Sequence, residues 1–293
     1  MMRSLFKKKA EDAQRFFGTY DLVKVQSMQQ EAEYKRIHAE MAAKYPDNIA
    51  LLGYKVYSQT DEDGIIEAIF KRIPNDKRFV EIGIQTGIEC NTINLLLNGW
   101  KGTWIEGSSK YCRKIAADLK GISFPNKLNV VNAFVDKENI IGLFKTANDF
   151  FNSTEIDFFS LDIDGNDYHI MEVLLVNAFL PKVICVEYNA KFRPPLKFEV
   201  KYDPKIVWDG TDYQGCSLQS YVDLLAGFNY TLICCNLPGT NAFFVRNEFV
   251  PAFTRYSTEE LYQPNRYYLS PIRLAHKPSL FYLRDMLAGN NNG

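Results

Sequence analysis

The sequence predicts an α/β fold built on a doubly wound, mostly parallel sheet of seven strands. Five short apolar runs alternate with segments of helical periodicity, which is the pattern of repeated strand–helix units with right-handed crossovers. Continuous apolar runs such as residues 158–163 indicate strands covered by helices on both faces. Two strand patterns flank Leu237-Pro-Gly-Thr240 and predict a terminal antiparallel hairpin.

The expected elements follow one another along the chain at regular spacing. We expect parallel strands at 78–84, 102–107, 128–134, 157–163 and 182–188, and hairpin strands at 230–235 and 241–246. Helical patterns cover 64–73, 90–98, 110–119, 138–150, 167–179 and 218–228. Residues 191–216 break this rhythm with three prolines and several aromatic side chains. We expect this segment to form a long excursion over the carboxyl edge of the sheet.

Both ends of the chain lie outside this pattern. Residues 3–45 are rich in Lys, Glu, Gln, Ala and Met, contain no proline, and predict one or two exposed helices that divide near Gly18. These helices either cap the domain or provide a contact between copies in a homo-oligomer. We therefore expect an N-terminal helical extension at 1–50, an α/β domain at 51–250 and a C-terminal extension at 251–293.

Composition and charge restrict the class of protein. With 34 basic and 35 acidic residues the net charge is −1, so nothing favours nucleic acid or an anionic membrane as a partner. No apolar stretch approaches the roughly 20 residues that cross a bilayer, and the first residues contain no apolar core of a signal peptide. The six cysteines have no metal-type spacing and are typical of buried thiols. We expect a cytoplasmic protein without a membrane span.

The clearest functional signal is residues 79–89, Phe-Val-Glu-Ile-Gly-Ile-Gln-Thr-Gly-Ile-Glu. An apolar run ends at Glu81, and Gly83 and Gly87 follow before a helical pattern that starts near Asn91. This order of strand, tight turn and helix cradles nucleotides in α/β folds. Because it lacks a Cβ, Gly83 would let the backbone approach a ligand. The spacing is E-x-G-x-x-x-G, so the third glycine of NAD sites is missing.

A second acid, Glu106, closes the next apolar run and is followed by Gly107. A carboxylate at this strand end can accept hydrogen bonds from both hydroxyls of a ribose. A surface carboxylate is the alternative, but an acid that ends an apolar strand is poorly placed for that role. The sequence therefore favours Glu106 as a ligand of a ribose.

Acids also close the fourth and fifth expected strands. Asp162 and Asp164 lie two residues apart and hence on one side of a strand, and Glu187 and Asn189 follow the next strand. These oxygen-bearing side chains could orient a substrate, act as a general base, or bind Mg²⁺. Asp162 could instead accept hydrogen bonds from backbone amides at the start of the next helix.

Together, these strand ends resemble those of class I S-adenosylmethionine (SAM) dependent methyltransferases. Leu161-Asp-Ile-Asp-Gly-Asn-Asp167 and Val186-Glu-Tyr-Asn189 are similar to the ends of the fourth and fifth strands in FkbM-type and related sugar or small-molecule O-methyltransferases. The resemblance covers about residues 54–247. It implies a Rossmann-like fold, SAM as the cofactor, and methyl transfer to an oxygen of a sugar or of a glycan- or nucleotide-linked small molecule.

The resemblance also implies which residues bind SAM. The glycine turn and Glu81 would meet its amino-acid half, Glu106 its ribose, and the end of the third strand its adenine, although Phe134 is equally suited to a place in the core. Gln59 lies in a segment, 57–63, that either folds over the pocket or caps a helix. The expected cofactor-binding residues are Gln59, Glu81, Gly83, Gly87, Glu106, Gly107, Ala133, Phe134 and Asp162.

Three residues are expected to act on the acceptor: Asp164, His169 and Glu187. His169 follows the Asp164-Gly165 pair by one helical turn and has an ordinary pKa near neutrality, although a lone histidine on a helix is more often structural. A metal is not favoured, because metal-dependent relatives place acid and amide residues side by side, and here Tyr188 separates Glu187 from Asn189. Mg²⁺ bound by Asp164, Glu187 and Asn189 is the alternative.

Two other classes of function remain open. A Rossmann oxidoreductase that binds NAD or a nucleotide sugar would also use Gly83 and Glu106, but the missing G-x-G-x-x-G and the terminal hairpin argue against it. A non-catalytic interaction protein with the SAM fold would lose the pocket acids, which are present here. The expected partner is a small molecule or glycan. Aromatic side chains of the excursion could stack on sugar faces, namely Phe192, Tyr202, Trp208 and Tyr213.

Overall fold

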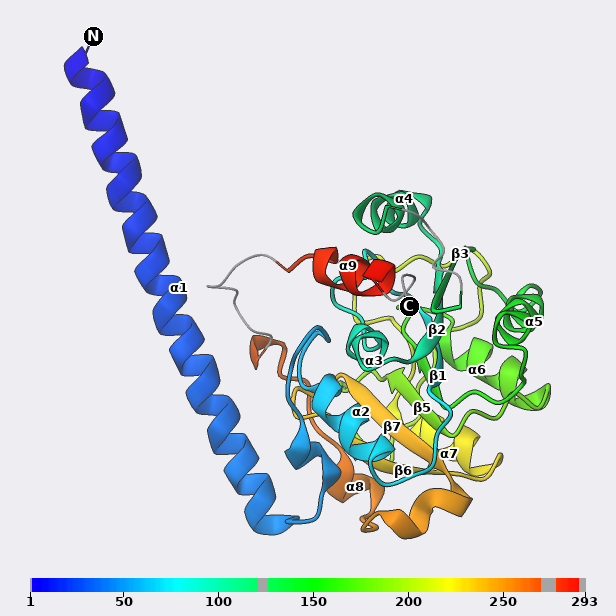
Figure 1. The fold of residues 1–293 in the computed structure, drawn as a ribbon. Helices are drawn as coiled ribbons and strands as arrows, with labels where there is room; N and C mark the ends of the chain where they lie inside the picture. The colour runs from blue at the N-terminus through cyan, green and yellow to red at the C-terminus, as the bar shows by residue number, and fades with distance from the viewer. Residues whose placement is uncertain (1, 121–125, 270–277, 290–293) are drawn as a thin grey trace.

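A computed structural model describes residues 2–120, 126–269 and 278–289, with the side chains of α1 described from residue 22 onward. Its centre is one seven-stranded sheet of order β3-β2-β1-β4-β5-β7-β6 (Figure 1). The parallel strands are β1 (Arg78–Ile82), β2 (Lys101–Glu106), β3 (Leu128–Asn132), β4 (Phe158–Leu161) and β5 (Val183–Glu187). β7 (Asn241–Arg246) runs antiparallel between β5 and β6 (Tyr230–Cys235). The expected doubly wound sheet with its terminal hairpin is confirmed.

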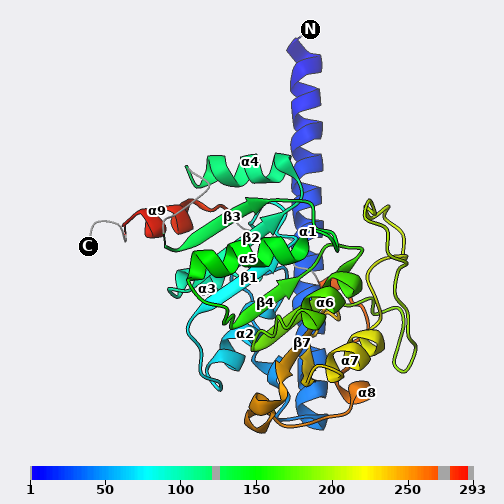
Figure 2. The same ribbon diagram turned by 90° about the vertical axis from the view of Figure 1, so that its right-hand side faces the viewer.

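Helices cover both faces of this sheet (Figures 1 and 2). On one face α2 (Glu62–Phe70), α3 (Ile93–Leu97), α4 (Ser109–Asp118) and α9 (Phe281–Gly289) contribute to one apolar core. On the other face α5 (Ile140–Phe151), α6 (Asp167–Val176) and α7 (Leu218–Ala226) contribute to a second core. Alternate residues of each strand point to opposite faces, so Phe158 joins the first core and Phe159 the second.

The strand and helix bounds between β1 and β7 differ from the expected ones by three residues or fewer, and both hairpin strands match. The difference that matters most for the turn after β1 is at α3, where the expected helix at 90–98 is a five-residue helix that starts at Ile93. A loop therefore separates the glycine turn from this helix. The excursion at 191–216 is confirmed as irregular structure, and Figure 2 shows it in yellow-green beyond the carboxyl ends of the strands.

The N-terminal extension is one continuous helix, which corrects the expected division near Gly18. α1 spans Met2–Lys44 and runs through this glycine without a break. Its C-terminal part lies on the body, where Ile37 and Met41 are buried and Tyr34 Oη donates to Asp61 Oδ2 at 3.2 Å. A single glycine costs a helix only about 1 kcal/mol relative to alanine, so one such residue does not end a helix of this length.

The C-terminal extension continues around the β6 edge as η2 (Asn247–Ala252), α8 (Thr258–Leu261) and η3 (Tyr267–Leu269), followed by α9. Leu261, Leu269 and Leu283 are buried, so this extension shares the two cores that flank the sheet. His276 and the polar tail at 290–293 lie outside the described residues. All six cysteines are buried and free. In the described part of the chain, no helix combines the length and apolar character needed to cross a membrane.

Candidate functional site

A cavity of about 470 Å³ lies at the carboxyl ends of β1 to β4. This is the edge at which open parallel sheets bind their ligands. The lining comes from the loops that follow these strands, from α4 and from the excursion, and consists of Ile82, Gly83, Gln85, Glu106, Gly107, Ser108, Tyr111, Ala133, Phe134, Val135, Asp162, Ile163, Asp164, Asn166, Ile206, Val207 and Trp208. Seven residues expected from the sequence are among them, namely Gly83, Glu106, Gly107, Ala133, Phe134, Asp162 and Asp164.

Glu106, the last residue of β2, is held in one orientation by backbone amides. Its Oε2 accepts a hydrogen bond from the Gln85 N–H and its Oε1 one from the Ser108 N–H, both at 2.7 Å. The Gln85 backbone adopts a left-handed φ of 51° next to this bond. Burial raises the pKa of Glu106, and the amide donors oppose that rise. Because each carboxylate oxygen has two lone pairs, Glu106 can still accept two hydroxyl groups from the cavity.

Gly83 is required by the packing of the protein itself. Its φ is +88°, and a Cβ at this position would lie 1.5 Å from the carbonyl oxygen of Asp162. The turn after β1 thus packs directly against the backbone of Asp162, the residue that follows β4. Gly87 (φ +72°) does not line the cavity, and a Cβ there would meet the Trp104 ring at 3.2 Å. The first glycine forms cavity wall, whereas the second shapes the turn.

Glu81 lies outside the cavity lining, and its hydrogen bonds argue against the expected contact with SAM. It precedes the last residue of β1, and its side chain accepts hydrogen bonds from the Asn91 N–H at 2.8 Å and from the Thr92 hydroxyl. Trp104 Nε1 donates to the same hydroxyl at 2.8 Å. Burial raises the pKa of Glu81 to about 7. Glu81 therefore ties the loop before α3 to the sheet.

Gln59 is exposed and does not line the cavity. The segment around it is clasped to the start of α2, because Asp63 Oδ2 accepts hydrogen bonds from the backbone N–H groups of Val56, Tyr57 and Ser58 at 2.6–2.8 Å. Of the two sequence interpretations of this segment, these contacts favour the helix cap.

His169 also lies outside the lining. Its Nε2 is 2.8 Å from the carbonyl oxygen of Val200, so this nitrogen carries the proton and donates. The ring packs against Tyr202, with 5.6 Å between the centroids. His169 thus fastens the excursion to α6, which argues against a role in proton transfer from the acceptor.

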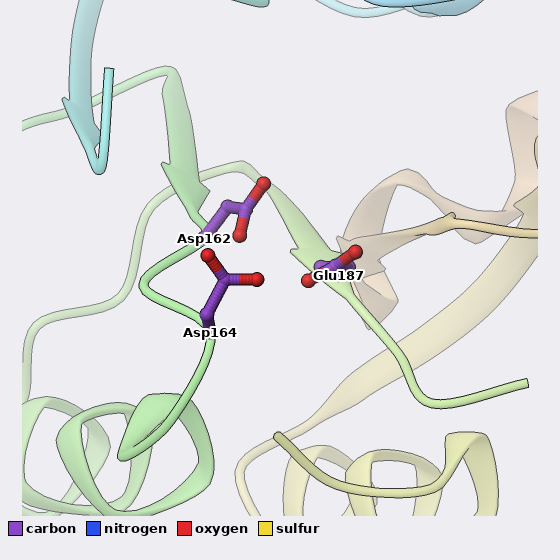
Figure 3. Close-up of side chains that lie close together, drawn as sticks. All are labelled: Asp162, Asp164 and Glu187. Atoms are coloured by element: carbon purple, nitrogen blue, oxygen red, sulfur yellow. The ribbon is translucent and has the colours of Figure 1, made fainter. Parts of the chain in front are cut away.

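Three half-buried carboxylates converge where β4 and β5 end (Figure 3), and two of them, Asp162 and Asp164, line the cavity. Asp162 and Asp164 follow β4, Glu187 ends β5, and their oxygens lie within 4.8 Å of one another. A proton shared between Asp162 and Glu187 would join these two carboxylates in a hydrogen bond and relieve part of their repulsion. Among the described residues, no amide, hydroxyl or cationic side chain forms a hydrogen bond or ion pair with these three carboxylates. Burial and mutual repulsion raise the pKa of Asp162 and of Glu187 well above the ordinary range.

The loop that presents Asp164 is fixed by its neighbours. Asp167 accepts hydrogen bonds from the Ile163 N–H at 2.7 Å and the Gly165 N–H at 2.8 Å, and Asp164 between them has a left-handed φ of 57°. Asn166 Nδ2 donates to the carbonyl oxygen of Asp203 at 2.8 Å and links the loop to the excursion. Sequence reasoning missed these supporting residues, although both lie in the Leu161–Asp167 motif.

Asn189 turns away from the three carboxylates. Its Nδ2 donates to the carbonyl oxygens of Asp212 at 2.9 Å and Gln214 at 3.1 Å. A cation at this end of the cavity would therefore be held by Asp162, Asp164 and Glu187, all hard oxygen donors. The expected alternative set with Asn189 does not assemble.

Of the four aromatic residues expected to face a sugar, Trp208 is the one that lines the cavity. Phe192 stacks on Phe198 with 4.1 Å between ring centroids. The hydroxyls of Tyr202 and Tyr213 accept hydrogen bonds from the backbone N–H groups of Lys137 and Lys201, respectively. These three rings therefore stabilise the excursion, and Ile206 and Val207 join Trp208 in the wall instead.

Comparison with known proteins finds only distant likenesses. No family model and no curated protein matches the chain. Solved structures with a similar chain course include the SAH-bound O-methyltransferase from Bacillus cereus (14% identity, 74% of this chain and 89% of that chain, TM-score 0.39). A second is the SAH-bound methyltransferase PaMTH1 from Podospora anserina (13% identity, 73% of this chain and 87% of that chain, TM-score 0.40). A third is the SAH-bound N-terminal domain of EvdMO1 (13% identity, 72% of this chain and 94% of that chain, TM-score 0.42).

The fold assignment rests on the sheet itself, since these likenesses are remote. Five parallel strands in the order 3-2-1-4-5 are extended by β7 and β6, with β7 antiparallel to its neighbours. The antiparallel insertion distinguishes this sheet from that of NAD-binding Rossmann domains. The chain therefore has the Rossmann-like fold of class I methyltransferases.

Proposed function

We propose that this protein is a SAM-dependent methyltransferase that acts on an oxygen atom of a small molecule. The observation that carries the proposal is the cavity of about 470 Å³, which has Glu106 at one end and Asp162 and Asp164 at the other. An oriented carboxylate can accept hydrogen bonds from the hydroxyls of a ribose, and the acids at the other end can take a proton from an acceptor bound there. When bound, SAM supplies an electrophilic methyl group.

The Glu106 end of the cavity fits a nucleoside. Both oxygens of Glu106 are fixed by backbone amides, so the carboxylate accepts ribose hydroxyls without further ordering. Ala133, Phe134 and Val135 follow β3 and form an apolar wall beside it. Phe134 is 48% exposed, which is unusual for a large apolar side chain next to two cores, and stacking on a planar base would cover it.

The other end of the cavity fits the reacting groups. Gly83 borders it through the turn after β1, beside the backbone of Asp162, and no side chain intervenes at this position. An acceptor hydroxyl loses one proton as it is methylated, and Asp164 lines the cavity where it can take that proton. Rigid support of Asp164 by Asp167 favours catalysis by positioning of the reactants.

The acceptor is proposed to be a sugar or a glycan- or nucleotide-linked molecule. Trp208 is 47% exposed at the wall formed by the excursion, and its ring offers a flat apolar surface for the face of a sugar. The remaining acceptor contacts would come from Asp164 and Asn166, which offer hydrogen-bonding groups suited to hydroxyls.

The three carboxylates also support a second version of this chemistry, in which they bind Mg²⁺. Their repulsion is relieved either by a shared proton or by a cation. We favour the shared proton, because Asn189, the amide expected to complete a Mg²⁺ site, donates instead to the carbonyl oxygens of Asp212 and Gln214.

The competing classes of function have less support. In an NAD-binding domain the glycine turn leads directly into a helix whose N-terminus binds the pyrophosphate. Here ten positions separate Gly83 from Ile93, the first residue of a short α3. A non-catalytic role would not require three clustered acids beside a cavity, none of them paired with a cationic side chain of the described residues.

Thermal unfolding in the presence of candidate ligands tests the proposal. We expect SAM and SAH to raise the Tm, and NAD to leave it unchanged. A ligand at 100 times its Kd stabilises the folded state by about 2.7 kcal/mol, which is readily measured. Stabilisation by NAD without stabilisation by SAH would contradict the proposal and favour the oxidoreductase.

A further inference from the structure

The charges that line the cavity are all of one sign. Among the described residues, the lining includes the carboxylates of Glu106, Asp162 and Asp164 and no Lys, Arg or His side chain. The carboxylate of Glu187 adds another negative group, since its oxygen lies within 4.8 Å of those of Asp162 and Asp164 (Figure 3). The chain as a whole is nearly neutral, with 34 basic and 35 acidic residues, so this excess is local. A ligand in the cavity therefore lies in a negative potential.

The lysines that follow β3 and β5 are engaged with partners outside the cavity. Lys137, after β3, has its Nζ 3.4 Å from Glu172 Oε2 and 4.9 Å from the centroid of the Tyr202 ring. Lys191, after β5, pairs with Asp212. One proton shared within the cluster of three carboxylates still leaves two negative charges on it. A ligand with a positive charge would relieve the repulsion that remains.

The chemistry of SAM directs its positive charge toward these acids. The sulfonium is bonded to the 5′ carbon of the ribose, whereas the base is bonded to the 1′ carbon at the other end of the ring. In the placement proposed above, Glu106 accepts the ribose hydroxyls and Phe134 covers the base, so the sulfur lies on the side of the turn after β1. Gly83 in this turn adds no side chain and packs against the backbone of Asp162. The positive charge is therefore directed to the end of the cavity that Asp162 and Asp164 line.

We infer that this cavity distinguishes SAM from the product SAH by charge, because Asp162, Asp164 and Glu187 attract a sulfonium but not a neutral sulfide. The inference rests on the proposed function. Methyl transfer breaks the bond between sulfur and the methyl carbon, forms a bond between that carbon and the acceptor oxygen, and leaves the bonding electron pair on sulfur. The proton of the acceptor hydroxyl passes to Asp164 and then to water. SAH thus lacks the attraction that SAM has, which favours release of the product after each turnover.

Other states of these acids lead to a different expectation. A cluster neutralised by further protons, or by Mg²⁺, would keep little negative charge and would bind SAM and SAH alike. The difference in affinity between the two molecules therefore reports whether the acids are charged beside the sulfur.

Isothermal titration calorimetry at pH 7.5 in the presence of EDTA measures the affinity of the full chain for SAM, SAH and sinefungin. Sinefungin is an unreactive analogue in which a carbon that bears an ammonium group replaces the sulfonium. All three molecules share the adenosine and the amino-acid half, so their affinities differ through the charge at the sulfur position. We expect SAM and sinefungin to bind about tenfold more tightly than SAH. Equal affinities, or tighter binding of SAH, would overturn the inference and leave the proposed function intact, whereas failure of all three to bind would overturn both.

Asp164→Asn tests the assignment of the charge, because it removes one negative charge with little change in size. We expect the preference for SAM over SAH to fall about threefold, with the affinity for SAH within about twofold of the wild type. The matched control is Glu155→Gln, which removes an exposed acid near the amino end of β4 and is expected to keep the wild-type preference.

Glu187→Gln provides a second variant, at a residue outside the cavity lining, and serves also if Asp164→Asn does not fold. We expect it to lower the preference for SAM in the same direction as Asp164→Asn. A preference that survives both substitutions, or equal weakening of SAM and SAH by both, would overturn the assignment of this selectivity to the three carboxylates.

Discussion

β4 has an aspartate immediately before it and another immediately after it, and the two have opposite surroundings. Asp157 precedes the strand and is buried, but its Oδ2 accepts hydrogen bonds from the Asp76 and Arg78 N–H groups at 3.0 and 2.9 Å. Its Oδ1 lies 2.8 Å from Lys182 Nζ. Asp162 follows the strand, and its neighbours are the carboxylates of Asp164 and Glu187.

This contrast separates an acid that stabilises the fold from acids that serve a ligand. A buried carboxylate destabilises a protein unless hydrogen bonds and an opposite charge compensate it. The protein supplies that compensation at the amino end of β4 and leaves it out at the carboxyl end, where the cavity lies. Uncompensated acids in a cleft are a mark of functional sites, because proton transfer or ligand binding needs them available.

The largest effect expected from this comparison is on stability. Asp157→Ala leaves Lys182 and two backbone N–H groups without their partner, so we expect the free energy of unfolding to fall by about 3–5 kcal/mol. Urea denaturation measures this change. Asp157→Asn retains an acceptor oxygen and is expected to lose less. A loss below about 1 kcal/mol for the alanine variant would show that this acid is not the compensated one.

The fold could be predicted from sequence because its signals are local. Apolar runs and helical periodicity located every strand of the sheet, and the Pro-Gly connection located the hairpin. The expected division of α1 failed because the prediction gave one glycine more weight than the surrounding helix formers.

The site could be predicted only in part, and Glu81 and Glu106 show why. Both close apolar runs, but Glu106 is the last residue of β2, whereas Ile82 follows Glu81 in β1. Glu81 pairs in register with Trp104, so it points to the same face of the sheet as Glu106 but lies two residues nearer the amino end of the strands, where Asn91 and Thr92 bind it. His169 likewise contacts Val200, 31 residues away, and no local pattern reveals such a contact.

The next effect in size concerns the cavity. We expect Glu106→Ala to weaken SAH binding by about 2–4 kcal/mol, because the variant loses a charged acceptor for two hydroxyl groups. Isothermal titration calorimetry measures the affinity. The matched control is Glu155→Ala, which removes an exposed acid near the amino end of β4. Equal affinity of Glu106→Ala and wild type would move the nucleoside away from this end of the cavity.

At the carboxyl end of β4 we expect a smaller effect on stability, with a sign opposite to that of Asp157→Ala. Because burial, and after it repulsion by neighbouring carboxylates, raise the pKa of Asp162 in the folded state, that state binds more protons than the unfolded chain above about pH 4. Stability therefore falls as pH rises through this window, up to the folded pKa. We expect Asp162→Asn to stabilise the protein by about 1–2 kcal/mol at pH 7.5 and to have little effect below about pH 4. Destabilisation at pH 7.5 would show that Asp162 is compensated like Asp157.

The smallest expected effect decides how the carboxylates at the end of the cavity are neutralised. If Asp162 and Glu187 share a proton, 5 mM MgCl₂ or EDTA should leave the Tm of the wild-type chain unchanged. A Mg²⁺ site with a Kd of about 50 µM would instead stabilise the chain by about 2.7 kcal/mol at that concentration. Asp162→Asn distinguishes specific from general ion effects, since it removes one of three ligands and leaves the surface charge otherwise intact. Stabilisation by Mg²⁺ in the wild type that disappears in Asp162→Asn would contradict the shared proton. It would establish that the carboxyl end of β4 holds a cation where the amino end holds Lys182.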